Sequence, residues 1–185
     1  MKIFYAGDST CAQNNITTFP LTGIGQGLEL YVKKEIKIHN HAVNGRSTKS
    51  FIDQGRLAVI EREINAGAVP VLITPLERRC FEDAWKLGAG EHGDYVVGMK
   101  QVAEEEHVAL IDLYTKSRAK MEEVGAVETT KWFMHLAKGE YPSYPEGKVD
   151  NTHLKPEGAR IFAGLVAEGL KELGGVYADL LVEKI

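Results

Sequence analysis

The stretch IFYAGDST, residues 3–10, joins a short apolar run to a glycine and three small polar residues. A short apolar run that ends at a glycine or proline is typical of a buried strand. The same pattern returns at Val69–Thr74 (VPVLIT), which ends at Pro75, and at Val108–Ile111, which Asp112 follows. These three runs predict buried strands with polar residues directly after them.

Segments with a helical spacing of apolar residues alternate with the strands. They are Thr22–Glu35, Asp53–Asn65, Tyr95–His107, Leu113–Val124, Lys131–Leu136 and a last helix that begins near Pro156. A further strand is expected within Glu35–Val43. Alternating strands and helices favour an α/β fold with a parallel sheet. No linker, charge block or repeat divides the chain, so we expect a single domain over residues 1–185.

The composition is that of a soluble globular protein, with 44% hydrophobic and 26% charged residues in 185. A net charge of -4 provides no electrostatic footprint for nucleic acid or an anionic membrane, so neither is an expected partner. No run approaches the ~18 apolar residues of a membrane span, and the N-terminus is too quickly interrupted for a signal peptide. Cys11 and Cys80 have no metal-ligand spacing and are expected to be free thiols. A cytoplasmic location follows as an expectation.

Function gathers at the carboxyl ends of the strands in a parallel sheet, which directs attention to four segments. They are Gly7–Thr10, Asn44–Ser47, Thr74–Arg79 and Asp112. Ser9 lies just past the first strand, where its hydroxyl is a candidate nucleophile. Asp8 and Ser9 are also common helix-capping residue types, so a purely structural role is the alternative.

A serine nucleophile needs a base, and that base needs an orienting acceptor. Asp150-Asn151-Thr152-His153 supplies both, since the spacing lets a carboxylate and an imidazole lie side by side. Asp150 would then hold one ring nitrogen of His153 while the other faces Ser9. In the alternative, Asp150 or Thr152 caps the helix after Pro156 and His153 is exposed. The other five histidines are interpreted as surface or packing residues.

A glycine at position 45, after the second strand, lets a ligand approach the main chain closely. The Gly45 N–H is therefore a candidate oxyanion donor. A plain Asn-Gly turn is the alternative.

Together, Gly7-Asp8-Ser9, Gly45 and Asp150-x-x-His153 resemble the SGNH (GDSL) hydrolase superfamily. With Phe51 and the run from Thr74 to Arg79, these motifs are similar to rhamnogalacturonan acetylesterases and their bacterial relatives. The resemblance implies a three-layer αβα sandwich with a parallel sheet of flavodoxin-like order. It also implies Ser9 as nucleophile, His153 as general base, Asp150 as its orienter, and the N–H groups of Ser9 and Gly45 as oxyanion donors. No metal or organic cofactor is implied.

One motif of the superfamily is missing from this sequence. Relatives carry Gly-x-Asn-Asp after the third strand, where the Asn side chain is a further oxyanion donor, and this chain has no such motif. Because parallel strands need crossovers of a dozen or more residues, a whole central strand–helix unit is predicted to be absent. Asn65 is no obvious substitute for the missing donor, because it falls in a helical segment. The missing unit has three explanations. The chain is a natural or engineered deletion, or residues are omitted from the determined sequence, or the protein is a relative that kept only its sugar-binding surface.

The resemblance predicts a serine esterase that removes acetyl groups from acetylated pectic oligosaccharides. Arg46, Arg78 and Arg79 are candidates to pair with galacturonate carboxylates, or they are surface or sheet-capping residues. The aromatic segments 132–135 and 141–144 could line a sugar site, although packing is the commoner role. The alternative function is a catalytically impaired carbohydrate-binding relative. A nucleotide-binding role is set aside because no phosphate-binding glycine motif occurs.

Overall fold

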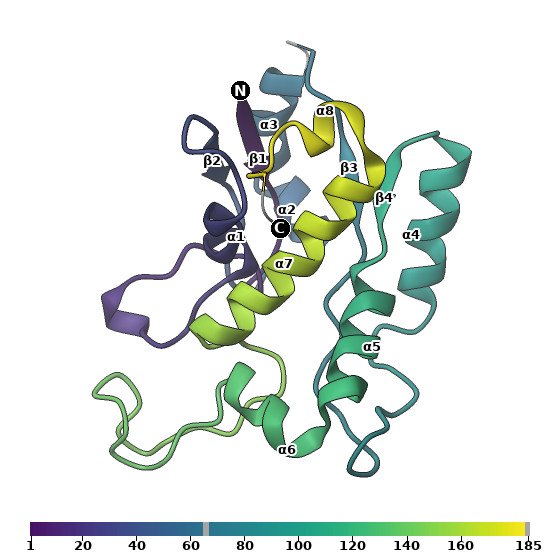
Figure 1. The fold of residues 1–185 in the computed structure, drawn as a ribbon. Coiled ribbons are helices and arrows are strands. Elements are labelled where there is room, and N and C mark those ends of the chain that lie inside the picture. Colours follow the sequence, from purple (N-terminus) through teal and green to yellow (C-terminus); the bar gives the residue numbers. More distant parts are fainter. Residues whose placement is uncertain (65–66, 184–185) are drawn as a thin grey trace.

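The computed structural model describes residues 1–64 and 67–183 of the chain. The strands in this part are β1 (Lys2–Tyr5), β2 (Lys37–Asn40), β3 (Val71–Ile73) and β4 (Ala109–Ile111). The α-helices are α1 (Ile24–Gly27), α2 (Thr48–Asp53), α3 (Arg56–Ile64), α4 (Asp94–Glu105), α5 (Leu113–Val124), α6 (Ala126–Thr129), α7 (Pro156–Leu173) and α8 (Gly175–Ala178). Short 3-10 helices lie at η1 (Ile16–Thr18), η2 (Leu28–Leu30) and η3 (Thr130–Trp132). The predicted alternation of strands and helices is confirmed (Figure 1).

The helix predicted over Thr22–Glu35 is wrong in its extent, because only α1 and η2 form there. Glycines allow this short helix to pack unusually close to α7. A Cβ atom on Gly27 would lie 2.4 Å from the carbonyl oxygen of Ala159. Glycine in this segment therefore allows close helix–helix contact at the expense of helix propensity, since glycine costs about 1 kcal/mol within a helix.

The helix predicted over Lys131–Leu136 is also wrong beyond Trp132. There the chain is extended, and Phe133 pairs with Leu154 in an isolated antiparallel bridge. The N–H of Met134 donates to the carbonyl oxygen of His153 at 2.9 Å. Backbone hydrogen bonds to a distant segment, which no local pattern reports, override the helical spacing here.

The strands of the described residues pair two by two, and both pairs are parallel. β1 pairs with β2 in the register Tyr5↔Asn40, and β3 pairs with β4 in the register Ile73↔Ile111. No strand of the described residues joins β1 to β3. The split lies beside the strand that leads to Ser9, where the sequence predicts a missing strand–helix unit.

Helix α7 lies between the two strand pairs and packs on elements of both (Figure 1). It contacts α1 on the side of β1 and β2, and it contacts β4 and α5 on the other side. A Cβ atom on Gly169 would lie 2.5 Å from Cγ2 of Ile111, so helix and strand nearly touch. Among the described residues, no helix is long and apolar enough to span a bilayer.

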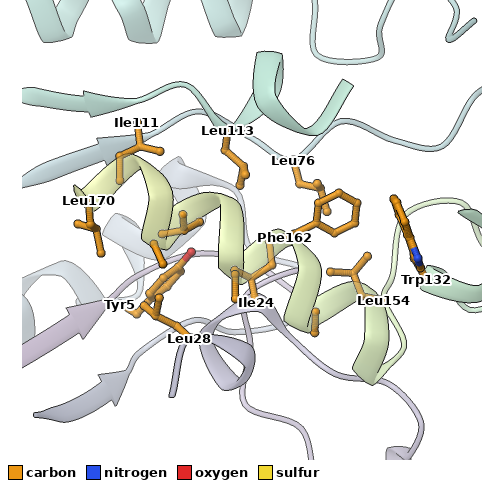
Figure 2. Packing of buried hydrophobic residues seen from close by; sticks show 14 of the residues in the cluster. Tyr5, Ile24, Leu28, Leu76, Ile111, Leu113, Trp132, Leu154, Phe162 and Leu170 are labelled. Atoms are coloured by element: carbon orange, nitrogen blue, oxygen red, sulfur yellow. The ribbon is translucent and has the colours of Figure 1, made fainter. Parts of the chain in front are cut away.

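The hydrophobic core surrounds α7. Phe162 is fully buried and contacts Trp132 and Phe133 edge to face, with ring centroids 5.8 Å apart in each pair. Figure 2 shows Tyr5 and Ile24 on one side of this helix and residues from the β4 side on the other. One continuous core therefore joins the two strand pairs, although no backbone hydrogen bond of the sheet does so in the described residues.

The close contact between α7 and β4 predicts opposite outcomes for one substitution at two helical glycines. Gly169→Ala should lower the free energy of unfolding by about 1 kcal/mol net, because overpacking against Ile111 outweighs the gain in helix propensity. Gly98→Ala in α4 meets no atom within 4 Å and should raise it by up to about 1 kcal/mol. Urea denaturation of both variants measures their free energies of unfolding. A stabilised Gly169→Ala variant would contradict the packing described here.

Candidate active site

Ser9 lies on a tight turn directly after β1. The parallel pairing continues past the strands, since Gly7 O accepts a hydrogen bond from the Val43 N–H at 3.0 Å. Asp8 Oδ1 then accepts the Thr10 N–H at 2.9 Å and the Thr10 hydroxyl at 2.8 Å. The Asp8 side chain therefore holds the turn on which the Ser9 hydroxyl projects.

Gly7 is required here by a close approach rather than by its backbone angles. A Cβ atom at this position would lie 3.0 Å from Cβ and 3.2 Å from Sγ of Cys11. Burial raises the pKa of the Cys11 thiol to about 11. This thiol therefore stays protonated at neutral pH and is a weak nucleophile, because the reactive form is the thiolate. Cys11 and Cys80 are both free thiols.

Asp150 and His153 lie on one turn of chain that approaches Ser9. Asp150 Oδ1 accepts the backbone N–H groups of Thr152 at 2.8 Å and of His153 at 2.9 Å. Its Oδ2 lies 2.8 Å from His153 Nδ1, and His153 Nε2 lies 2.9 Å from Ser9 Oγ. Neither Asp150 nor Thr152 caps α7, whose N-cap is Lys155 without a side-chain cap bond. The structure thus brings together the three residues that the sequence singled out.

The charge state of Asp150 follows from its partners. Burial alone would raise its pKa. Four hydrogen bonds nevertheless hold that pKa well below the ordinary range, and they come from the backbone of His153, the Lys148 ammonium, the backbone of Thr152 and the His153 ring. An ionised carboxylate only accepts hydrogen bonds, so the proton lies on His153 Nδ1. In the neutral imidazole, Nε2 is then unprotonated and accepts a hydrogen bond from the Ser9 hydroxyl.

Lys148 is a site residue that the sequence reasoning missed. Its Nζ lies 2.9 Å from Asp150 Oδ2, the same oxygen that faces the His153 ring. In extended chain, residues two apart point to the same side, so the spacing Lys148-x-Asp150 is the signal that could have revealed it. Lys148 is fixed at its backbone as well, through a bridge to Leu136.

The segment that carries Asp150 is clamped through its neighbour Asn151. Asn151 Oδ1 accepts from Arg79 Nη1 at 3.1 Å and lies 2.7 Å from His135 Nε2. The Arg79 N–H also donates to Asn151 O at 2.9 Å, and its guanidinium reaches Thr129 Oγ1 at 3.0 Å and the carbonyl of Ala126. Each guanidinium nitrogen of Arg79, a predicted substrate-binding residue, thus donates to a protein group. Arg79 and His135 together form a clamp on Asn151.

The remaining predicted site residues lie in more open surroundings. Gly45 has a φ of 69°, a left-handed conformation that favours glycine, and a Cβ there would meet nothing within 4 Å. Arg46 donates from Nε to Gln54 Oε1 at 2.8 Å. Arg78 is exposed, with Nη1 3.7 Å from Glu91 Oε2. In the described residues, the N–H groups of Ser9 and Gly45 have no protein acceptor.

The predicted segments after β3 and β4 have structural partners. Glu77 is buried, and its Oε2 accepts from Arg118 Nη1 at 2.7 Å. Asp112 is the N-cap of α5, where it accepts the Thr115 N–H at 3.1 Å. Of the predicted aromatic segments, Trp132 is buried in the core, whereas Tyr141 and Tyr144 are only half-buried. Within residues 1–64 and 67–183, no three His, Cys, Asp or Glu side chains cluster as metal ligands would.

Two curated proteins of Bacillus subtilis strain 168 are similar to the chain over its whole length, although no protein-family model matches it. "Rhamnogalacturonan acetylesterase RhgT" is 32% identical over 224 aligned positions, which cover 100% of this chain and 95% of RhgT. "Probable rhamnogalacturonan acetylesterase YesY" is 33% identical, with 98% of each chain covered. The RhgT alignment has 224 positions and this chain has 185 residues, so at least 39 positions of RhgT have no counterpart here. That length accommodates one strand–helix unit.

Solved structures show a similar fold. The protein YXIM from Bacillus subtilis superposes with a TM-score of 0.78 at 24% identity, over 95% of this chain. This chain spans 57% of that protein. A catalytic mutant of the acetylxylan esterase Axe2 from Geobacillus stearothermophilus has a TM-score of 0.53 at 16% identity, with 95% of each chain covered. At these identities the likeness concerns the fold, and it confirms the predicted α/β class.

The clamp predicts different costs for two adjacent arginines. Arg79→Lys should lower the free energy of unfolding by about 1.5–3 kcal/mol, because an ammonium cannot reproduce the hydrogen bonds of the planar guanidinium. Arg78→Lys, at an exposed position, should change it by no more than about 0.5 kcal/mol. Thermal and urea unfolding of the two variants test this. Equal free energies of unfolding for the two variants would show that the hydrogen bonds of Arg79 do not hold the segment around Asn151 in place.

The lowered pKa of Asp150 predicts how stability changes with pH. A carboxylate with a depressed folded-state pKa contributes stability above its unfolded value of about 4, and loses it as the pH falls through the folded-state value. The stability difference between the parent protein and Asp150→Asn should therefore narrow as the pH falls from about 5 to about 2. Urea unfolding at several pH values measures it, with exposed Asp53→Asn as the control. A stability difference that stays constant between about pH 5 and about pH 2 would contradict a lowered pKa of Asp150 in the folded protein.

Proposed function

The chain belongs to the rhamnogalacturonan acetylesterase family of SGNH hydrolases and is a carboxylic ester hydrolase, and from this premise we propose that it removes acetyl groups from acetylated pectic oligosaccharides of the rhamnogalacturonan type. The observation that carries the proposal is the continuous hydrogen-bonded series from Ser9 Oγ through the His153 ring to Asp150 Oδ2. The named relatives supply the substrate class, since both carry rhamnogalacturonan acetylesterase in their names.

Acyl transfer would begin at Ser9. His153 Nε2 takes the hydroxyl proton while Ser9 Oγ attacks the acetyl carbonyl carbon, and a tetrahedral intermediate forms. Asp150 stabilises the imidazolium that results, because its carboxylate already accepts from Nδ1. His153 then returns the proton to the departing sugar oxygen, which leaves an acetyl group on Ser9. Water, deprotonated by His153, attacks this ester and releases acetate, and Ser9 regains its proton.

The negative oxygen of the intermediate needs hydrogen-bond donors. We assign this role to the N–H groups of Ser9 and Gly45, which have no protein acceptor in the described residues. Gly45 follows the extension of β2 that pairs with the extension of β1, so both N–H groups belong to one edge of this strand pair. The third donor of the superfamily, an Asn side chain, is missing from the sequence, and the loss of one donor typically costs about 10²–10³ in rate. We therefore expect this chain to be a slower esterase than relatives that carry the Asn donor.

The decisive experiment compares Ser9→Ala with the parent protein. Acetate release from acetylated rhamnogalacturonan oligosaccharides, and hydrolysis of p-nitrophenyl acetate, should fall by at least about 10³-fold. Thr115→Ala, which removes an exposed hydroxyl on α5, is the matched control and should keep the parent rate. If parent and Ser9→Ala are folded and equally inactive, the chain is a carbohydrate-binding relative rather than an esterase. Activity on p-nitrophenyl acetate alone would refute the substrate class.

A further inference from the structure

Asp150 Oδ2 is shared between two cationic or potentially cationic groups. His153 Nδ1 lies 2.8 Å from this oxygen and Lys148 Nζ lies 2.9 Å from it. The other carboxylate oxygen is occupied by two backbone N–H groups and does not face either side chain. Lys148 and His153 therefore draw on the same negative charge.

Lys148 is held in this position from two further sides. Its backbone N–H and carbonyl both bond to Leu136, at 3.0 Å and 2.8 Å. Its Nζ also lies over the ring of Tyr144, 5.6 Å from the centroid, and the Tyr144 hydroxyl donates to Thr18 O. Because the backbone is fixed independently, the ammonium can be removed without releasing the segment that carries Asp150.

The charged and titratable groups on the surrounding elements do not compete for this carboxylate. Asp8, beside Ser9, bonds to Thr10, whereas Arg79 and His135 bond to Asn151. Among the described residues, Lys148 is the only side chain besides His153 that reaches the Asp150 carboxylate.

We propose that Lys148 is an electrostatic positioning residue of the esterase reaction, which keeps His153 unprotonated at lower pH by sharing Asp150 Oδ2 with it. This inference rests on the proposed function. Lys148 acts through Asp150 Oδ2, which its Nζ contacts, rather than on the reacting atoms. Its positive charge offsets the carboxylate that would stabilise an imidazolium, so the free base persists to more acidic pH. The same charge makes the imidazolium of the transition state slightly less favourable.

The test is the pH profile of kcat/KM for Lys148→Met, Lys148→Arg and the parent protein. Lys148→Met should move the midpoint of the acid limb upward by about half a pH unit to one pH unit, with a plateau rate at least equal to that of the parent. Lys148→Arg should keep the parent midpoint, because the charge remains. Lys138→Met, which removes an exposed lysine paired with Glu146 on the same loop, is the matched control and should shift nothing.

A second measurement separates this inference from the proposed function. NMR titration of the His153 ring, assigned by its absence in His153→Asn, reports protonation whether or not the protein is active. An upward shift of that midpoint in Lys148→Met supports the role of Lys148 even if Ser9→Ala proves no slower than the parent. An unchanged midpoint in both measurements overturns it, as does a lower plateau rate at an unchanged midpoint, which would show a merely structural role.

Discussion

The packing of α7 between the two strand pairs is the interaction on which the rest of this molecule depends. In an ordinary parallel sheet, backbone hydrogen bonds would join β1 to the strands beyond it, whereas here the described strands remain in two separate pairs. The α7 helix replaces that connection with side-chain packing, through Ala159 and Ala163 against α1 and through Gly169 against Ile111. Small residues on this helix let both neighbours approach closely, and Phe162 fills the space between them.

The position of His153 relative to Ser9 also depends on the packing of α7. Ser9 extends from the β1 side, while His153 precedes α7 by only three residues and is held there by backbone bonds of its neighbours. Thr22 N–H donates to Leu154 O, and Lys155 N–H donates to Trp132 O, each at 2.9 Å. The hydrogen bond between Ser9 and His153 therefore forms across the contact between the β1 pair and the start of α7. This contact does not depend on a strand between β1 and β3, since none joins them among the described residues.

Electrostatics at the site are concentrated on one carboxylate. Asp150 receives two backbone N–H groups on one oxygen and two side chains on the other, which keeps it ionised and orients the His153 ring. Asn151, the next residue, is held by Arg79 from the segment after β3, so that both strand pairs contribute to the position of Asp150 and His153. RhgT has at least 39 positions without a counterpart here, and in this chain the hydrogen bond between Asp150 and His153 forms without them.

The sequence by itself determined the fold class, most of the strands and the α5 and α7 helices, because apolar period and helix-ending residues are local properties. It also singled out Ser9, Asp150 and His153 as a candidate nucleophile, orienter and base, because an Asp and a His three residues apart can lie side by side. The resemblance to a family whose Gly-x-Asn-Asp motif is absent here indicated the missing strand–helix unit. The tertiary structure decided what depends on distant partners. The extended segment after Trp132 follows from its pairing with Leu154, the clamp of Arg79 on Asn151 joins residues 72 positions apart, and the place of Lys148 depends on which oxygen of Asp150 the backbone leaves free. Such contacts form between segments that no local pattern relates, so only the folded chain reveals them.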